Sequence, residues 1–197
     1  MREIAILIPA AGASSRMRGR DKLLEEIDSQ PLLSRQAQKA MASGAPVLVT
    51  VRPGDARLGV LPTGVDHREV PQASEGLSAS LRVAAAWAQA HSAGALMVML
   101  ADLPDLTTDD LETIAAAYAQ DPSRIIRATD DSGKPGHPVI FPAAFFDAIQ
   151  KLTGDDGAKS LLAQHPPRFC RLPGLRATTD LDTPEDWAAW RAKHARK

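Results

Sequence analysis

Residues 4–22 read IAILIPAAGASSRMRGRDK and hold the features that decide the fold. Ile4 to Ile8 form an apolar run whose length and β-branched content predict a buried strand. Pro9 ends this run because proline has no N–H to donate to a neighbouring strand. A loop of small residues follows, and four cations come after it within seven residues. A strand leading into such a loop is typical of a nucleotide site at the carboxyl edge of a sheet.

The loop has the chemistry of a phosphate site. Small side chains let backbone N–H groups come close to a ligand, and Gly12 can adopt a positive φ. Neither G-x-G-x-x-G nor G-x-x-x-x-G-K-[ST] is present, so a surface turn with ordinary arginines stays open on composition alone. The small and basic residues are Ala10, Ala11, Gly12, Ala13, Ser14, Ser15, Arg16, Arg18, Arg20 and Lys22.

Strands and helices alternate along the rest of the chain. Apolar runs predict strands at residues 46–51, 66–70, 96–100, 124–129, 136–141 and 168–172. Helical spacing follows Pro31, Gly76, Thr107 and Thr183, and a further helix is predicted over residues 143–152. This alternation predicts an α/β fold with a mainly parallel sheet. The 197 residues have the length of a single domain spanning residues 1–197.

Composition narrows the functional class. A net charge of −1 argues against nucleic acid or a membrane surface as the main partner. The single cysteine, Cys170, fits a reducing cytoplasm, and its place in a predicted strand favours an inert core thiol. The apolar run after Met1 breaks at Pro9, so no secretory signal is expected. The longest apolar run, Ala93 to Ala101, is too short to cross a bilayer.

A second informative segment is PQASEGLSASL at residues 71–81, which precedes an alanine-rich helix. The first turn of that helix offers free N–H groups and a positive dipole end to an anion or a polar base. An ordinary N-cap made by Ser78 explains the same pattern without a ligand. As a nucleotide site, the segment would contribute Gly76, Ser78 and Ser80.

Asp102 directly follows the most apolar strand, residues 96–100. A carboxylate in this position is costly unless it is solvated, paired or bound to a metal. At a ligand-binding sheet edge, Mg²⁺ is the natural partner, held by one or two carboxylates and by phosphate oxygens. The alternative is that Asp102 turns the chain ahead of Pro104.

The segment DLDTPED at residues 180–186 contains a second pair of acids. Thr183 and Asp186 form a capping-box pattern at the start of a helix. Asp180 and Asp182 lie outside that pattern, and their spacing points them to the same side of an extended chain. These two carboxylates are therefore further candidates for a site.

The order of these segments resembles the MobA-like nucleotidyltransferases, and most closely the molybdopterin cytidylyltransferases. The matching motifs are G-x-S-x-R-M with a nearby lysine at 12–22, G-[LM]-S-x-S-L at 76–81, L-A-D-x-P at 100–104, G-H-P-V-x-F at 136–141, G-D-x-G-A-[RK] at 154–159 and D-[IL]-D-T-P-E-D at 180–186. The resemblance covers nearly the whole chain. It implies a three-layer α/β/α sandwich with a Rossmann-like, nucleotide-diphospho-sugar transferase fold.

The resemblance also implies a reaction and a set of roles. A phosphate-bearing acceptor, molybdopterin, would receive a nucleotidyl group from an NTP, and pyrophosphate would leave. Catalysis would depend on Arg16, Lys22 and Asp102, with Mg²⁺ held by Asp102 and Asp182. The acceptor would lie against His137, Asp155, Lys159 and Asp180. The nucleotide would be held by Ala10, Ala11, Gly12, Ser14, Arg16, Lys22, Gly76, Ser78 and Ser80. A molybdoenzyme or a chaperone would then be the partner that receives the product.

The identity of the base rests on residue 11. GTP-using relatives carry Gly-Gly where this chain has Ala11-Gly12, and the extra methyl group would crowd a purine, so CTP is expected.

Arg18 is an additional residue compared with relatives that have Met-Gly directly. The segment Pro9–Gly12 also resembles methylerythritol-phosphate cytidylyltransferase, which is the alternative enzyme, although Leu23 follows Lys22 where that family continues Pro-Lys-Gln. A non-catalytic nucleotide-binding regulator or cofactor chaperone is the alternative outside enzymes.

Overall fold

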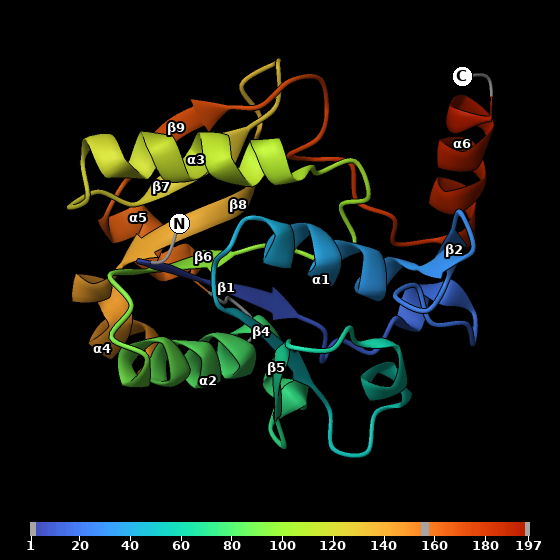
Figure 1. Ribbon diagram of the computed structural model, residues 1–197, viewed down its shortest axis with the longest axis horizontal. Helices are drawn as coiled ribbons and strands as arrows, with labels where there is room; N and C mark the ends of the chain where they lie inside the picture. The colour runs from blue at the N-terminus through green and yellow to red at the C-terminus, as the bar shows by residue number, and fades with distance from the viewer. Residues whose placement is uncertain (1–2, 155–157, 196–197) are drawn as a thin grey trace.

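The computed structural model describes residues 3–154 and 158–195. Its centre is a seven-stranded sheet with the strand order β5-β4-β1-β6-β8-β7-β9 (Figure 1). Among these described strands, only β8 runs antiparallel to its neighbours, so the prediction of a mainly parallel sheet is confirmed. The strands are β1 (Ile4–Pro9), β4 (Val47–Val51), β5 (Asp66–Glu69), β6 (Ala95–Val98), β7 (Ile126–Thr129), β8 (Pro135–Pro142) and β9 (Arg168–Arg171).

Helices cover both faces of the sheet and make three layers. Helices α1 (Leu32–Ala42) and α3 (Thr108–Gln120) pack on one face, and α2 (Leu77–Ala90), α4 (Phe146–Ile149) and α5 (Lys159–Gln164) pack on the other (Figure 1). Successive side chains of a strand point to opposite faces. Accordingly, Ile4, Ile6 and Ile8 of β1 join the core under α1 and α3, while Ala5 and Leu7 join the core under α2.

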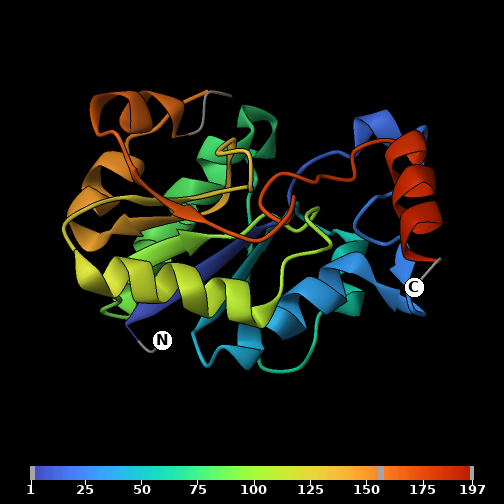
Figure 2. The same ribbon diagram turned by 90° about the horizontal axis from the view of Figure 1, so that it is seen from above.

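One end of the molecule carries a helix and a small hairpin. Helix α6 (Pro184–His194) lies beside the strands β2 (Glu26–Ile27) and β3 (Gln30–Pro31) at the end opposite α4 (Figures 1 and 2). Arg191 of α6 donates to the carboxylate of Glu25 and to the backbone carbonyl of Glu26. The last helix therefore ties the C-terminal segment back to the chain that follows the first loop.

Local sequence signals explain most helix ends. A capping box at Thr183 begins α6 as the sequence predicts, and the helix predicted after Thr107, α3, also begins with a capping box. Pro31 is the residue directly before α1, in agreement with the helical spacing that follows it. The helix predicted over residues 143–152 is wrong in extent, because a 3₁₀ turn at Ala143–Phe145 leads into the four residues of α4.

The sheet has a topological switch point at β1. From β1 the chain moves outward to β4 and β5 on one side, and it later returns to β6 on the other side of β1. Ligands of such sheets bind in the crevice outside the carboxyl ends of the strands at this point. The loops after β1 and β6 both begin there. No helix within residues 3–154 and 158–195 is both long and apolar enough to cross a membrane.

Candidate active site

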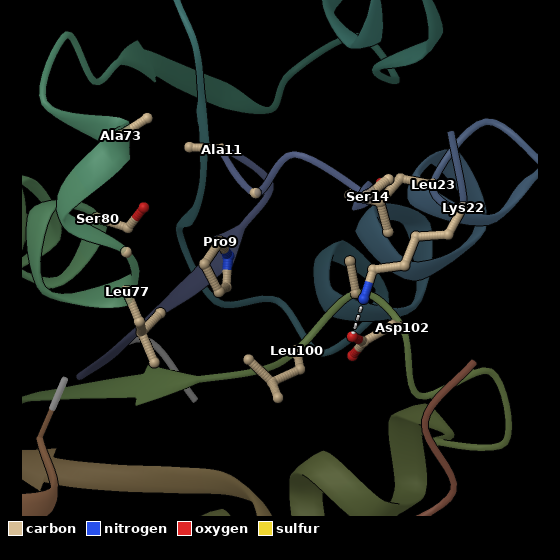
Figure 3. A pocket seen from close by; sticks show the side chains of 13 residues that line it. Pro9, Ala11, Ser14, Lys22, Leu23, Ala73, Leu77, Ser80, Leu100 and Asp102 are labelled. Atoms are coloured by element: carbon tan, nitrogen blue, oxygen red, sulfur yellow. Dashed lines mark hydrogen bonds and ion pairs between the residues drawn. The ribbon is translucent and has the colours of Figure 1, made fainter. Parts of the chain in front are cut away.

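A cavity of about 240 Å³ opens at the switch point. Figure 3 shows Lys22 and Asp102 meeting on one side of it, with Ala11, Ala73 and Ser80 on the other. Six of the nine predicted nucleotide-binding residues line it, whereas Ala10 and Ser78 are buried outside the wall and the exposed Arg16 is not part of it. The lining residues are Pro9, Ala11, Gly12, Ser14, Lys22, Leu23, Ala73, Gly76, Leu77, Ser80, Leu100, Ala101 and Asp102.

The charged side chains predicted from three distant segments come together at the edge of this cavity, which Lys22 and Asp102 line and Arg16 and Asp182 do not. The ammonium of Lys22 donates to Asp102 Oδ2 at 2.5 Å and to Asp182 Oδ1 at 2.6 Å. Arg16 pairs with the other oxygen of Asp182 at 2.7 Å. The backbone N–H of Leu181 donates to the carbonyl of Asp102 at 3.0 Å, which fixes the two acidic segments to each other.

Burial and charge act in opposite directions on this cluster. Burial alone would lower the pKa of Lys22, but the carboxylates of Asp102 and Asp182 outweigh it and raise that pKa. Burial would raise the pKa of Asp182, but Lys22 and Arg16 lower it. Asp180 lies nearby, and partial desolvation of its carboxyl together with the charges of Asp182 and Asp102 raises the pKa of that carboxyl. The lysine is therefore charged and Asp182 is ionised at neutral pH.

Asp102 has a buried oxygen that is available to a further ligand. Its Oδ1 atom has no hydrogen-bond donor among the described residues, whereas Oδ2 accepts from Lys22. Carboxylate oxygens are the ligands that Mg²⁺ and Mn²⁺ prefer. Over the described ranges, no three His, Cys, Asp or Glu side chains converge as a ready-made metal cage. Asp102 and Asp182 thus fit a cation that also takes ligands from a bound phosphate.

A buried arginine organises the first loop, and the sequence gives no signal for it. The side chain of Arg57 is 1% exposed. Its Nη1 donates to the carbonyls of Ala10 and Gly12, and its Nε and Nη2 donate to the carboxylate of Asp21 at 2.7 and 2.9 Å. Nη2 also lies 3.1 Å from the hydroxyl of Ser14. Arg57 belongs to a 3₁₀ turn, Ala56–Val60, inside a segment that the sequence predicts only as a loop.

These bonds decide which way the loop presents its amides. In a trans peptide the C=O of one residue and the N–H of the next point in opposite directions. Because Arg57 holds the carbonyls of Ala10 and Gly12, the N–H groups of Ala11 and Ala13 point away from it. Within the described chain, neither of these N–H groups has an acceptor. The loop therefore offers unpaired donors to an anion.

The start of α2 differs from the expected serine cap. The helix begins at Leu77 with Gly76 at the N-cap, where φ is +68°, and no side chain caps it. Ser78 is the second residue of the helix, and its fully buried hydroxyl has no partner among the described residues. The alternative of a Ser78 N-cap is therefore wrong. The uncapped first turn keeps its N–H groups for a ligand at the cavity wall.

The residues expected to face an acceptor are divided. His137 and Lys159 line a second cavity of about 180 Å³, and Leu77 belongs to the walls of both cavities. Asp180 is exposed near Asp182. Asp155 lies outside the described residues. The structure therefore brings two of the four expected residues to one cavity beside the first.

The additional residue in the loop does not reach the cavity. Arg18 adopts a left-handed conformation with φ of +53°. Its guanidinium pairs with Glu185 of α6 at 2.7 Å, and its side chain is 73% exposed. The extra residue therefore turns the chain toward α6 without entering the phosphate loop.

Comparisons with known proteins agree with this geometry. The model of the MobA-like NTP transferase domain matches residues 6–169. A search of curated protein sequences found no match. The crystal structure of Rv0371c from Mycobacterium tuberculosis H37Rv has a TM-score of 0.81 at 26% identity and covers 95% of this chain and 96% of its own. A structure of Rv0371c from the same organism in complex with manganese has a TM-score of 0.75 at 25% identity and covers 94% of this chain and 96% of its own. CMP:2-keto-3-deoxy-manno-octonic acid synthetase complexed with CTP shares the fold, with a TM-score of 0.77, 16% identity and 98% coverage of both chains.

Proposed function

The chain belongs to the MobA-like NTP transferase family, and we propose that it transfers CMP from CTP to the phosphate of a molybdopterin-type acceptor, with release of pyrophosphate. The observation that carries this proposal is the cluster in which Lys22 joins Asp102 to Asp182. This cluster lies beside a loop that presents unpaired amides. A triphosphate needs cations, free N–H donors and a metal-binding carboxylate pair in one place, and these residues supply all three.

Asp102 and Asp182 would hold the divalent cation, with Asp102 Oδ1 as the oxygen that has no donor among the described residues. We propose Mg²⁺, and the related Rv0371c has been solved in complex with manganese. When bound, such a cation neutralises charge on the phosphates and makes the α-phosphorus more electrophilic.

Lys22 would exchange partners during binding. Its ammonium now balances two carboxylates, which are the same groups that a divalent cation would use. Two cations cannot share one carboxylate pair without strong repulsion. The flexible lysine side chain can turn from the carboxylates to the triphosphate, where its charge is again balanced. One residue would therefore balance charge both before and after the nucleotide binds.

The remaining groups would position the reactants. The amides of Ala11 and Ala13 and the exposed guanidinium of Arg16 would bind the β- and γ-phosphates. A phosphate oxygen of the acceptor would then attack the α-phosphorus in line. One P–O bond forms, the bond to the β-phosphate oxygen breaks, and pyrophosphate leaves with the electron pair. Alignment and charge balance are sufficient for this chemistry, and no covalent enzyme intermediate is needed.

The methyl group of Ala11 supports the choice of CTP. Ala11 is 6% exposed and packs with Val70 and Ala79. In Figure 3 its methyl group points toward Ala73 across one side of the cavity. A pyrimidine needs less room there than a purine.

The test is a panel of CTP, GTP, ATP and UTP with Mg²⁺ and with molybdopterin, molybdenum-loaded molybdopterin or methylerythritol phosphate as the acceptor. We expect pyrophosphate release with CTP and a molybdopterin acceptor. Turnover with GTP but not CTP would remove the assignment of the base. Release with methylerythritol phosphate alone would favour the isoprenoid enzyme. Binding of CTP without release under any condition would favour a regulator or cofactor chaperone.

A further inference from the structure

The second cavity lies between the sheet and the helices α2 and α5, and its wall is mostly apolar. Among the described residues of this wall, three carry polar side chains, namely Arg127, His137 and Lys159. The apolar lining residues are Leu77, Leu81, Val98, Val139, Phe141, Ala158 and Leu162. A ligand that fits this wall has a flat or apolar body and a small number of hydrogen-bonding groups.

Arg127 supplies donors that nothing in the described chain uses. It lies on β7 opposite Val139 of β8, and its Nε donates to the carbonyl of Gly136 at 3.1 Å. Its two terminal nitrogens have no acceptor, and no carboxylate pairs with it, among the described residues. The side chain is half-buried, and burial lowers the pKa of its guanidinium. A partly buried cation without a partner is costly, so a ligand that supplies acceptors there would be bound favourably.

His137 supplies the opposite kind of group. Its Nδ1 lies 3.3 Å from the carbonyl of Val98, and because a carbonyl only accepts, Nδ1 carries the proton. Burial lowers the pKa of His137 to about 4, so the ring is neutral at physiological pH. Its Nε2 is then an unprotonated acceptor without a donor among the described residues. A ligand in the cavity would therefore meet the N–H donors of the Arg127 guanidinium and one acceptor, the Nε2 atom of His137.

We propose that this cavity binds the end of the acceptor remote from its phosphate, and that Arg127 and His137 recognise the cyclic amide edge of a flat ring. The Arg127 fork donates to the ring carbonyl, and His137 Nε2 accepts from the neighbouring ring N–H. Leu81 and Phe141 pack against the ring.

The position of the cavity agrees with this assignment, which rests on the proposed function. Leu77 separates the two cavities and belongs to both walls. His137 contacts the carbonyl of Val98, two residues before Leu100 in the wall of the nucleotide cavity. An acceptor with its ring in the second cavity can therefore extend its phosphate toward Asp102.

The test compares Michaelis constants for molybdopterin and for CTP in wild-type protein and in Arg127→Met. We expect the KM for molybdopterin to rise at least tenfold, while the KM for CTP stays within twofold. Arg127→Lys keeps the charge and the aliphatic stem but lacks the fork, so it should fold normally and still raise the KM for molybdopterin severalfold. Arg124→Met is the matched control, because Arg124 is an exposed neighbour that donates to the carbonyl of Pro166.

His137→Leu distinguishes a cyclic amide from an anion. Loss of the acceptor atom should weaken molybdopterin binding about tenfold if Nε2 receives a ring N–H, whereas an anion would bind equally well or better. An unchanged or lower KM in this variant, or an unchanged KM in Arg127→Met, would overturn the inference and leave the transferase proposal standing. Absence of wild-type turnover with molybdopterin would remove both.

Discussion

The two neighbouring cavities handle charge in opposite ways. Around the nucleotide cavity, cations and carboxylates are already paired with each other, as Lys22 is with Asp102 and Asp182 and as Arg57 is with Asp21. In the second cavity, Arg127 has no carboxylate partner among the described residues, and the walls are apolar. The first cavity must exchange existing interactions when a ligand enters. In the second, a ligand would supply Arg127 with acceptors that the described residues do not provide.

This difference separates the expected effects of mutations. Groups of the first cavity support the reaction and the folded loop at the same time, so their loss should affect turnover or stability strongly. Groups of the second cavity should affect acceptor binding and pH dependence with little effect on the nucleotide. Variants that violate this division would show that the two cavities are not functionally distinct.

The largest effect is expected for Asp102→Asn. The neutral amide oxygen is a weaker ligand of a divalent cation than a carboxylate, and the change removes the negative charge that pairs with Lys22. We expect kcat for pyrophosphate release to fall roughly 10³-fold or more, in the range found when a charge-stabilising group is removed from an active site. Stopped assays of pyrophosphate with saturating CTP and acceptor measure this loss.

Asp109→Asn provides the matched control for that variant. Asp109 lies seven residues further along, is exposed in the first turn of α3 and takes no part in the cavity. Its variant should keep wild-type turnover. A rate for Asp102→Asn within threefold of wild type would contradict the assigned role of Asp102.

The next largest effect is expected for Arg57→Met, measured as the free energy of unfolding in urea. The variant removes the Arg57 donors from the Asp21 carboxylate and from the carbonyls of Ala10 and Gly12. Breaking an ion pair whose arginine is buried costs about 3–5 kcal/mol. CTP affinity should also fall in the folded variant, because the loop amides lose their orientation. Arg68→Met, at an exposed arginine bonded to its neighbouring backbone carbonyl, should change stability by no more than about 0.5 kcal/mol. Equal stability in the two variants would show that Arg57 does not organise the loop.

The three-layer fold and the cluster of Lys22 and Asp102 could be predicted from the sequence. The arginines that support or line the cavities could not. Strand and helix periodicity placed Asp102 at the carboxyl end of a buried strand, and topology then brought it to Lys22. Arg57 could not be predicted, because its burial depends on carbonyls 45 and 47 residues away. Arg127 was equally hidden, since an arginine within a strand usually faces solvent. Local sequence pattern thus identifies functional residues at strand ends. The partners of a buried arginine lie far away in the sequence, so they can be identified only from the three-dimensional structure.

A third expectation concerns the pH dependence of stability in the second cavity. His137 has a folded pKa of about 4, below the ordinary value of about 6.5 in an unfolded chain. Between these values the unfolded state binds the extra proton, so stability is complete above pH 6.5 and falls as the pH drops toward 4. The loss should approach about 3 kcal/mol. Urea unfolding across this range should show a shallower fall for His137→Gln, and identical slopes for the two proteins would contradict a buried neutral His137.

The smallest effect, about tenfold in nucleotide selectivity, is expected for Ala11→Gly. One methyl group in a binding pocket changes discrimination by about 1–3 kcal/mol, and its removal should raise kcat/KM for GTP relative to CTP. Glycine also loosens the loop, so Ala13→Gly is needed beside it. Ala13 is exposed in the same loop and lies outside the cavity wall, and its variant gains the same backbone freedom without enlarging the cavity. If both variants shift the CTP to GTP ratio equally, loop flexibility rather than the Ala11 methyl selects the base. A shift seen only in Ala11→Gly would instead show that the Ala11 methyl group excludes the purine, because Arg57 holds the loop around it in place.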